Sequence, residues 1–212
     1  MASPFVHGIV HVVDDDDMTR KGTARLLEAA GFETRTYASA LDFLNSIEPH
    51  MQGCIILDVR LPDQNGLDLQ VALAERDVPL PIVFLTGFGA IRDSVRAIQR
   101  GAVDFLTKPV DGEVLLAAVS RALAQDGAAR AARAHRQNLR SRFERLTPRE
   151  REVFSHLIGG QLNKQVAADL DITERTIKMH RASILQKLEV SSMAEVARLA
   201  ADLGIDPAKP AS

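Results

Sequence analysis

The sequence predicts an α/β domain followed by a small all-α domain, and three observations support this fold class. Short apolar runs rich in β-branched residues alternate with helical patterns over residues 5–125. Such alternation is typical of a parallel sheet covered by helices on both faces. Four short helical patterns with tight turn signals between them follow after residue 145. A chain of 212 residues is long enough for two domains of this kind.

The first half contains five apolar runs that we interpret as the strands of one doubly wound parallel sheet. Glycines follow two of the intervening helical patterns, at Gly31 and Gly101, where a helix commonly ends. Ser39 is a suitable N-cap for a short helix. The expected strands are residues 9–13, 33–38, 54–57, 81–85 and 103–106. The expected helices are residues 19–30, a short helix after Ser39, residues 66–77 and residues 90–100. A last helix is expected to include Leu115, Leu116, Val119 and Leu123.

The segment between the two domains is rich in Ala and Arg and contains no proline. Both residue types favour helices, so we expect domains at residues 5–125 and 145–206 joined by a helical linker at 126–144. Thr147, Pro148 and Glu150 form a capping box with proline in the first helical position, which predicts a helix start. The predicted helices of this domain begin at the caps Thr147, Asn163, Thr173 and Ser192. In the same order, they end at Gly159–160, Leu170, Leu188 and Gly204. Ser192 and Glu195 form a second predicted capping box.

Composition and charge narrow the classes of protein. One cysteine excludes an intramolecular disulfide framework and a zinc–cysteine cluster, so we expect a reducing compartment, by default the cytoplasm. The N-terminal residues Met-Ala-Ser-Pro-Phe-Val-His show no basic n-region and no apolar h-region, so we do not expect export. No apolar run approaches the ~18–20 residues of a membrane span. Residues 1–125 hold 11 Lys and Arg against 17 Asp and Glu, and residues 126–212 hold 15 against 11. This asymmetry suggests a metal or phosphate site in the first half and a polyanionic partner for the second, although two solvated surfaces would give the same balance.

Four aspartates, residues 14–17, directly follow the first expected strand. Alone, such a run is normally a solvated loop or a helix N-terminus. Ligands of open parallel sheets, however, bind at the carboxyl ends of the strands, where Asp58, Thr86 and Lys108 also fall. Carboxylates bind a hard divalent cation such as Mg²⁺. A Thr hydroxyl and a Lys ammonium can hold the oxygens of a phosphoryl group attached to one carboxylate.

Four motifs at these strand ends resemble the receiver domain of two-component response regulators. They are Val-His-Val-Val-Asp-Asp, Ile-Leu-Asp-Val-Arg-Leu-Pro, Phe-Leu-Thr-Gly and Asp-Phe-Leu-Thr-Lys-Pro. The resemblance implies a flavodoxin-like receiver fold and phosphorylation of Asp58 by a sensor histidine kinase. It also implies Mg²⁺ bound by Asp14, Asp15, Asp58 and the Arg60 carbonyl, phosphoryl oxygens held by Thr86 and Lys108, and Phe105 as the aromatic residue that turns inward when Thr86 moves.

The loop after the fourth strand departs from the family pattern. Relatives often read Thr-Gly-His-Gly-Asp, where this chain reads Thr-Gly-Phe-Gly-Ala from Thr86. We hypothesise that Phe88 shields the acyl phosphate from water and slows its hydrolysis. An unchanged phosphate lifetime in a Phe88→His variant would contradict this hypothesis.

The third helix of the second domain carries Thr176, Lys178, His180 and Arg181 near its N-terminus. Apolar residues recur between them at core spacing, so these polar side chains face outward. A helix that enters the DNA major groove presents such side chains to bases and phosphates, although a solvated amphipathic helix has the same pattern.

Residues 145–204 resemble the LuxR/FixJ-type helix-turn-helix domain through Leu-Thr-Pro-Arg-Glu-Arg-Glu-Val, Gly-Gly-Gln-Leu-Asn-Lys-Gln-Val-Ala and Thr-Ile-Lys-Met-His-Arg. The resemblance implies double-stranded promoter DNA as partner and the fourth helix as a dimer contact. Some relatives have Lys where this chain has Ala182, so the target sequence cannot be carried over. The implied base readers are Lys178, Met179 and Arg181, and the implied phosphate contacts or positioning residues are Asn163, Lys164, Thr176 and His180.

The sequence therefore predicts a non-enzymatic transcriptional response regulator similar to the FixJ branch. Phosphorylation of Asp58 is expected to promote a homodimer through residues 92–105, DNA binding and, on family analogy, activation with RNA polymerase as a further candidate partner. A phosphorylation-independent DNA-binding regulator, with the receiver as a dimerisation module, is the main alternative.

Two other classes of function are less well supported. A haloacid-dehalogenase-like phosphatase places a second Asp two residues after its nucleophile, where this chain has Arg60, and the sequence has no Gly-x-x-x-x-Gly-Lys-Ser/Thr loop for a nucleotidase. An RNA-binding output domain would not require the recognition-helix pattern of residues 173–188.

Overall fold

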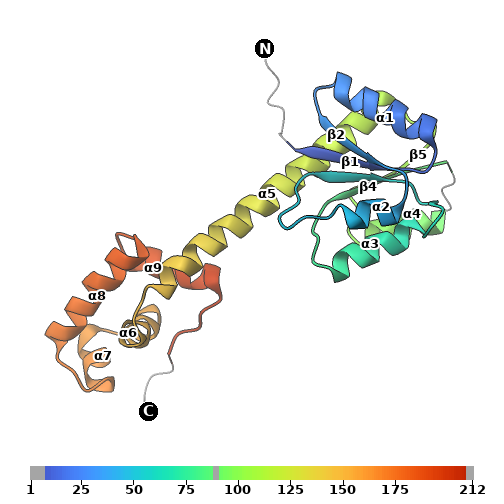
Figure 1. The fold of residues 1–212 in the computed structure, drawn as a ribbon. Coiled ribbons are helices and arrows are strands. Elements are labelled where there is room, and N and C mark those ends of the chain that lie inside the picture. Colours follow the sequence, from blue (N-terminus) through green and yellow to red (C-terminus); the bar gives the residue numbers. More distant parts are fainter. Residues whose placement is uncertain (1–7, 88–90, 209–212) are drawn as a thin grey trace. The chain divides into compact units, whose positions relative to one another are not determined.

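The protein is described here by a computed structural model covering residues 8–87 and 91–208 (Figure 1). The chain divides into two compact units, Met1–Arg130 and Ala131–Ser212. The division falls within the Ala- and Arg-rich segment that follows the sheet. None of the described helices is both long enough and apolar enough to cross a membrane.

The first unit contains a five-stranded sheet in the order β2-β1-β3-β4-β5, and all of its strand pairs are parallel. This confirms the parallel α/β fold predicted from the sequence. The chain moves outward from β1 to β2 and then returns to the other side of β1, so the carboxyl ends of β1 and β3 lie side by side. The strands are β1 Ile9–Val13, β2 Glu33–Tyr37, β3 Cys54–Leu57, β4 Ile82–Thr86 and β5 Asp104–Thr107.

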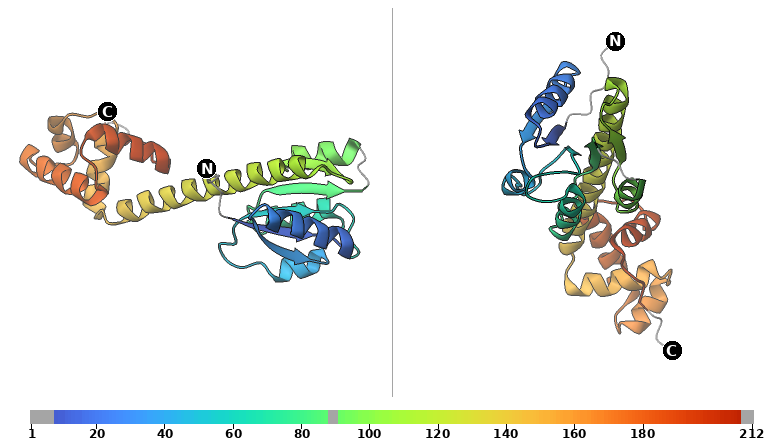
Figure 2. Two further views of the ribbon diagram at one scale, coloured as in Figure 1. Left: turned by 90° about the horizontal axis from the view of Figure 1, so that it is seen from above. Right: turned by 90° about the vertical axis from the view of Figure 1, so that its right-hand side faces the viewer.

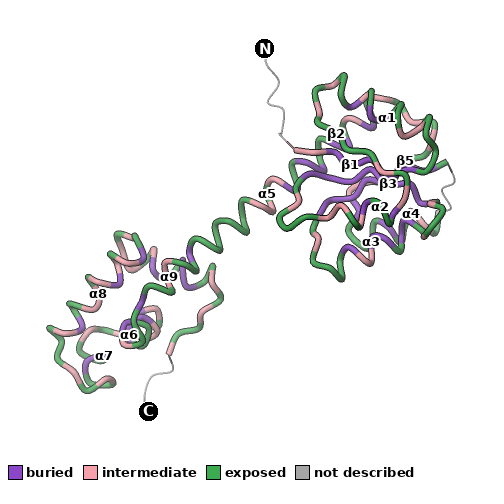
Figure 3. The backbone as a smooth tube through the Cα atoms, in the orientation of Figure 1, coloured by how far each residue is buried: buried purple, intermediate pink, exposed green. Residues whose placement is uncertain are grey.

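Helices cover both faces of the sheet, which makes it doubly wound (Figures 1 and 2). Alternate strand residues serve the two faces: Val12 packs in a cluster with Leu27 of α1 and Leu115 of α5, whereas Leu57 packs with Phe43 of α2. Buried residues accordingly follow the strands (Figure 3). The helices of this unit are α1 Asp17–Ala29, α2 Ala40–Asn45, α3 Gly66–Glu75 and α4 Ile91–Gln99, together with the first part of α5 Gly112–Glu144.

Helix α1 begins two residues before the predicted start at Thr19. Asp16 is its N-cap, and the Asp16 carboxylate accepts a 2.7 Å hydrogen bond from the Thr19 N–H. Ser39 caps α2 as predicted. Strands β4 and β5 each lie one residue later than predicted. These shifts place Thr86 and Thr107 as the last residues of their strands.

Helix α5 includes the whole segment predicted as a helical linker. The segment is not uniformly exposed, however. Asp126 is 1 % exposed within the first unit, and Leu139 is buried in the core of the second. The apolar residues at helical spacing near the start of α5, such as Leu115 and Val119, are core residues of the first unit.

Up to residue 208, where the described part of the chain ends, the second unit contains four further helices around one apolar core, formed by residues such as Val153, Ile177, Ile184 and Val196. The capping box of Thr147 and Glu150 is present as predicted. The helices are α6 Pro148–Ile158, α7 Asn163–Asp169, α8 Glu174–Leu188 and α9 Met193–Leu203.

Two predicted caps in this unit were wrong in detail. Leu162, not Asn163, is the N-cap residue of α7, and the Gln165 side chain accepts a 2.8 Å hydrogen bond from its N–H. Ser192 caps α9, but the Glu195 carboxylate accepts from the N–H of Ser191 instead of that of Ser192. In both cases a side chain three or four residues ahead satisfies a backbone donor before the helix.

Candidate functional site

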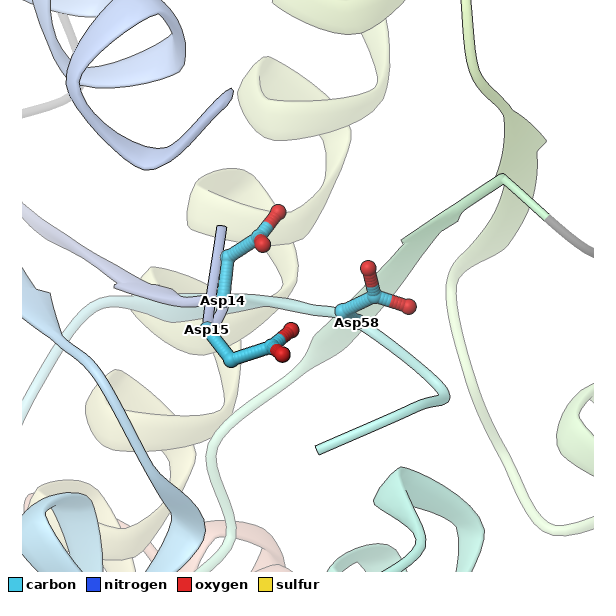
Figure 4. A group of neighbouring side chains, drawn as sticks. All are labelled: Asp14, Asp15 and Asp58. Atoms are coloured by element: carbon cyan, nitrogen blue, oxygen red, sulfur yellow. The ribbon is translucent and has the colours of Figure 1, made fainter. Parts of the chain in front are cut away.

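Three carboxylates meet at the carboxyl edge of the sheet (Figure 4). Asp14 and Asp15 follow β1 and Asp58 follows β3, and one carboxylate oxygen of each residue lies within 4.8 Å of the others. Asp14 and Asp58 are buried, whereas Asp15 is exposed. This set of hard oxygen donors, open to solvent on one side, fits a divalent cation such as Mg²⁺.

Lys108 follows β5 and reaches this carboxylate group from the opposite side of β4. Its Nζ lies 2.6 Å from a carboxylate oxygen of Asp14 and 2.6 Å from one of Asp58. Burial would lower the pKa of Lys108, but the hydrogen bonds that its ammonium donates to the carboxylates of Asp14 and Asp58 outweigh burial and raise the pKa. Burial raises the pKa of Asp14, and Lys108 offsets this only in part. The cluster therefore holds a charged ammonium between two closely spaced carboxyl groups.

The remaining residues predicted for this site lie at the same edge or one strand away. Thr86 ends β4 and is 1 % exposed. The Arg60 N–H donates a 3.1 Å hydrogen bond to the Asp58 carboxylate. Phe105 is half-buried on β5, with its ring centroid 5.7 Å from that of Phe84 on the paired strand. Phe88, for which we hypothesised a shielding role, lies outside the described residues.

The four consecutive aspartates have four different environments. The Asp14 carboxylate accepts hydrogen bonds from Lys108 and from the Asp16 N–H. Asp15 belongs to the three-carboxylate group, and Asp16 caps α1. Asp17 pairs on the surface with Lys21 at 2.8 Å. The aspartate run is thus both the start of helix α1 and part of the three-carboxylate group. The sequence pattern alone did not decide between these two roles.

Comparison with known families assigns both units. Residues 10–120 match the model of the response regulator receiver domain, and residues 144–200 match that of the bacterial regulatory proteins of the luxR family. The chain belongs to the response regulators. It regulates transcription and combines a receiver domain with a LuxR-type DNA-binding domain.

Individual relatives of this response regulator match it over nearly its whole length. Nodulation protein W of Bradyrhizobium diazoefficiens is 42% identical over 93% of this chain and 87% of its own. The transcriptional regulatory protein FixJ of Azorhizobium caulinodans is 37% identical over 96% of both chains. The low-resolution structure of the response regulator StyR matches with a TM-score of 0.84 at 41% identity, over 91% of this chain and 98% of that one. The two-domain organisation is therefore shared with these relatives.

The DNA-binding domain of this response regulator exposes one face of α8. Lys178 and Met179 are exposed, Met179 by 66 %, whereas Thr176 and His180 are half-buried. Arg175, which we did not predict as a DNA contact, is also exposed on this helix. Its position three residues before Lys178 on a helix is the signal that would have indicated it.

Two of the residues predicted to act at DNA are joined to each other. The Arg181 Nη1 donates a 2.8 Å hydrogen bond to the Asn163 side chain, which links α8 to the first turn of α7. Lys164, the next residue of α7, is exposed. The residues predicted for DNA contact thus comprise an exposed group and a linked pair.

Glu150 makes further contacts in addition to the predicted capping box. Its carboxylate accepts hydrogen bonds from the Thr147 N–H at 2.7 Å, from the Ser183 hydroxyl at 2.6 Å and from Lys187 at 2.7 Å and 2.9 Å. Burial would raise its pKa, but these donors outweigh burial and lower the pKa to about 2. Glu150 therefore fixes α8 against the start of α6.

Proposed function

We propose that this response regulator is controlled by phosphorylation of Asp58. The observation that carries the proposal is the position of the Asp58 carboxylate beside Asp14, Asp15 and the Lys108 ammonium. An oxygen of Asp58 attacks the phosphorus of a phosphohistidine on a sensor histidine kinase. The new O–P bond forms as the P–N bond breaks, and the imidazole leaves with the electron pair and takes up a proton. Cations beside the carboxylate offset its repulsion of the phosphoryl oxygens.

Each neighbour of Asp58 has a part in this transfer. Mg²⁺ bound by Asp14, Asp15, Asp58 and the Arg60 carbonyl would supply positive charge for the phosphoryl oxygens. Lys108 exchanges a bond to one of its carboxylates for a bond to a phosphoryl oxygen, and the Thr86 hydroxyl donates to another. Phe105, on the strand next to Thr86, then turns inward.

We propose that this change promotes a homodimer through residues 92–105. Two apolar side chains of α4 support the choice of surface, because Val95 is 48 % exposed and Ile98 is 47 % exposed. Exposed apolar side chains that share a helix face are candidates for burial in an interface. Pairing two receivers brings two DNA-binding domains to one DNA site and raises their effective concentration there.

The proposed DNA contacts follow the exposure of α7 and α8. Lys178 and Met179 read base edges, with Arg175 as an additional contact. Arg181 uses one donor on Asn163 and has further donors for DNA. Lys164, Thr176, His180 and Asn163 contact or position phosphates, and the assembled dimer acts on transcription by RNA polymerase.

Intact mass measurement tests the phosphoryl acceptor. The protein is incubated with Mg²⁺ and acetyl phosphate, with Asp58→Asn as the test variant and Asp68→Asn, at an exposed carboxylate of α3, as the matched control. We expect one added phosphoryl group on the wild type and the control and none on Asp58→Asn. Sedimentation and DNA binding are then compared between the two states. No adduct on the wild type would support the phosphorylation-independent alternative, and an adduct on Asp58→Asn would place the acceptor elsewhere.

A further inference from the structure

Arg20, in the first turn of α1, contacts three of the four consecutive aspartates. Its Nη1 donates to the backbone carbonyl of Asp14 at 2.7 Å and to that of Asp15 at 3.3 Å. Its Nη2 donates to the Asp17 carboxylate at 2.8 Å. The Arg20 side chain is only 14% exposed, although Asp17 is largely exposed. The guanidinium is therefore held within the loop that carries the cation ligands.

The two carbonyls that Arg20 contacts lie on either side of the Cα atom of Asp15. The Asp14 carbonyl belongs to the planar peptide group before Asp15, and the Asp15 carbonyl belongs to the one after it. The torsion angles φ and ψ of Asp15, about its N–Cα and Cα–C bonds, set the orientation of these two planes relative to each other. A single guanidinium that bonds both carbonyls thus restrains both angles, and with them the direction of the Asp15 side chain.

Asp15 depends on such a restraint more than Asp14 does. The Asp14 carboxylate is fixed by Lys108 and by the Asp16 N–H. Within residues 8–87 and 91–208, no hydrogen bond of the structure orients the exposed Asp15 carboxylate. Its direction toward Asp58 comes from the backbone.

We propose that Arg20 is a positioning residue for the divalent cation of the receiver. It holds the backbone on both sides of Asp15, so the Asp15 carboxylate is directed toward Asp14 and Asp58 before the cation arrives. The inference rests on the proposed function in one respect, since it assumes that this carboxylate group binds Mg²⁺. Residues that orient metal ligands typically change metal affinity by about tenfold or more when they are removed.

The positive charge of Arg20, taken alone, predicts the opposite effect of its removal on Mg²⁺ affinity. A cation near the site repels Mg²⁺, so a purely electrostatic role means that its removal tightens Mg²⁺ binding. A positioning role means that its removal weakens binding. The planar fork of Arg can bond two carbonyls and a carboxylate together, whereas a Lys ammonium lacks this geometry.

Titration calorimetry of Mg²⁺ into the full-length, unphosphorylated protein distinguishes the two roles. The variants are Arg20→Ala and Arg20→Lys, and the matched control is Arg25→Ala, which removes the same charge from an exposed position of α1. We expect the dissociation constant to rise about tenfold in Arg20→Ala, to rise less in Arg20→Lys, and to stay within about twofold in Arg25→Ala. An unchanged or lower dissociation constant in Arg20→Ala overturns the proposal. If Arg20→Ala does not fold, an unchanged constant in Arg20→Lys overturns it.

The Mg²⁺ dependence of labelling by acetyl phosphate gives a second readout. We expect the Mg²⁺ concentration for half-maximal labelling to rise in Arg20→Ala, while the rate at saturating Mg²⁺ stays within about twofold. A lower rate at saturating Mg²⁺ with unchanged half-saturation contradicts a positioning role. Failure of the proposed function is distinguishable, because the wild type would then bind Mg²⁺ without acquiring a phosphoryl group, and the calorimetric comparison would still decide the role of Arg20.

Discussion

The N–H of Gly53, just before β3, donates a 3.0 Å hydrogen bond to the carboxylate of Asp126 on α5. The same carboxylate accepts from the Arg130 Nε at 2.7 Å. Gly53 has a φ of +113°, and a Cβ at this position would lie 1.8 Å from the Ile9 carbonyl oxygen. Only glycine fits there. These contacts attach α5 to the amino edge of the sheet, opposite the edge that carries Asp58.

Replacing Asp126 by Ala should destabilise the receiver by about 2 kcal/mol, because the buried Gly53 N–H loses its acceptor. The free energy of unfolding from urea titrations followed by circular dichroism measures this effect. Gln125→Ala, at the exposed neighbouring position of α5, is the control and should change stability by less than about 0.5 kcal/mol. Equal stabilities of the two variants would contradict a structural role for Asp126.

The Glu150 carboxylate predicts a pH dependence in the DNA-binding domain. Its pKa is lowered from 4.5 to about 2, so the folded state binds its proton less readily than the unfolded chain does. The resulting stabilisation is complete above pH 4.5 and is lost as the pH falls toward 2. Glu150→Gln, which leaves Lys187 without its charged partner, should lower stability at neutral pH by about 3 kcal/mol.

Thermal unfolding of wild type and Glu150→Gln across this pH range tests the prediction. The difference between the two proteins should shrink as the solution becomes more acidic. Glu152→Gln, at an exposed position two residues along α6, is the control and should show a small difference at every pH. A wild-type advantage that is as large near pH 2 as at neutral pH would show that Glu150 does not act through its charge.

Cys54 offers a measure of receiver stability. It is the single cysteine of the chain, it is fully buried on β3, and burial raises the pKa of its thiol to about 12. Since the thiolate is the reactive form, alkylation should require the core to open. We expect iodoacetamide to label the native protein at least on the order of a thousandfold more slowly than the urea-unfolded chain. Comparable rates in the two states would mean that β3 is accessible in the folded protein.

Salt dependence separates the two kinds of DNA contact proposed for α7 and α8. Lys164→Ala, which removes a proposed phosphate contact, should weaken binding to all sequences and reduce the slope of log K against log salt by about 1. Met179→Ala should leave the slope unchanged and reduce discrimination between target and non-target DNA by about 1–3 kcal/mol. Fluorescence anisotropy at several salt concentrations measures both quantities. Arg25→Ala, exposed on α1 of the receiver, is the control, and a slope change in that variant equal to that of Lys164→Ala would contradict the assignment.

Local patterns were sufficient to predict the strands and the residues at their carboxyl ends. Each strand is a short apolar run, and parallel strands place Asp58, Thr86 and Lys108 at one edge regardless of loop structure. Capping residues in the same way predicted the starts of α2, α6, α8 and α9. Such features depend on residues that are close in sequence, so they are visible without the fold.

Contacts between distant segments could not be predicted in this way. The Asp63 carboxylate accepts hydrogen bonds from the N–H groups of Ala40 and Leu41 at the start of α2, more than twenty residues earlier. Asp126 reaches Gly53, and Glu150 reaches Lys187, over still longer separations. Asp63 and Asp126 have the sequence appearance of solvated surface residues, and only the tertiary fold supplies their partners. The capping box predicted the bond of Glu150 to Thr147 but not its bond to Lys187. The bond between Asn163 and Arg181 was likewise not predicted, since it joins two helices that are 18 residues apart in sequence at these positions.

The aspartate run at residues 14–17 has a consequence for how this gene can change. Deleting the codon of any one of the four yields the same shortened protein, because the residues are chemically identical. Asp14 is fixed in place by β1 behind it, and Asp17 by α1 ahead of it. A run of three would have to give up the proposed cation ligand Asp15 or the cap supplied by Asp16. Repetitive sequence of this kind usually tolerates changes in length, but here its length is set by four separate contacts.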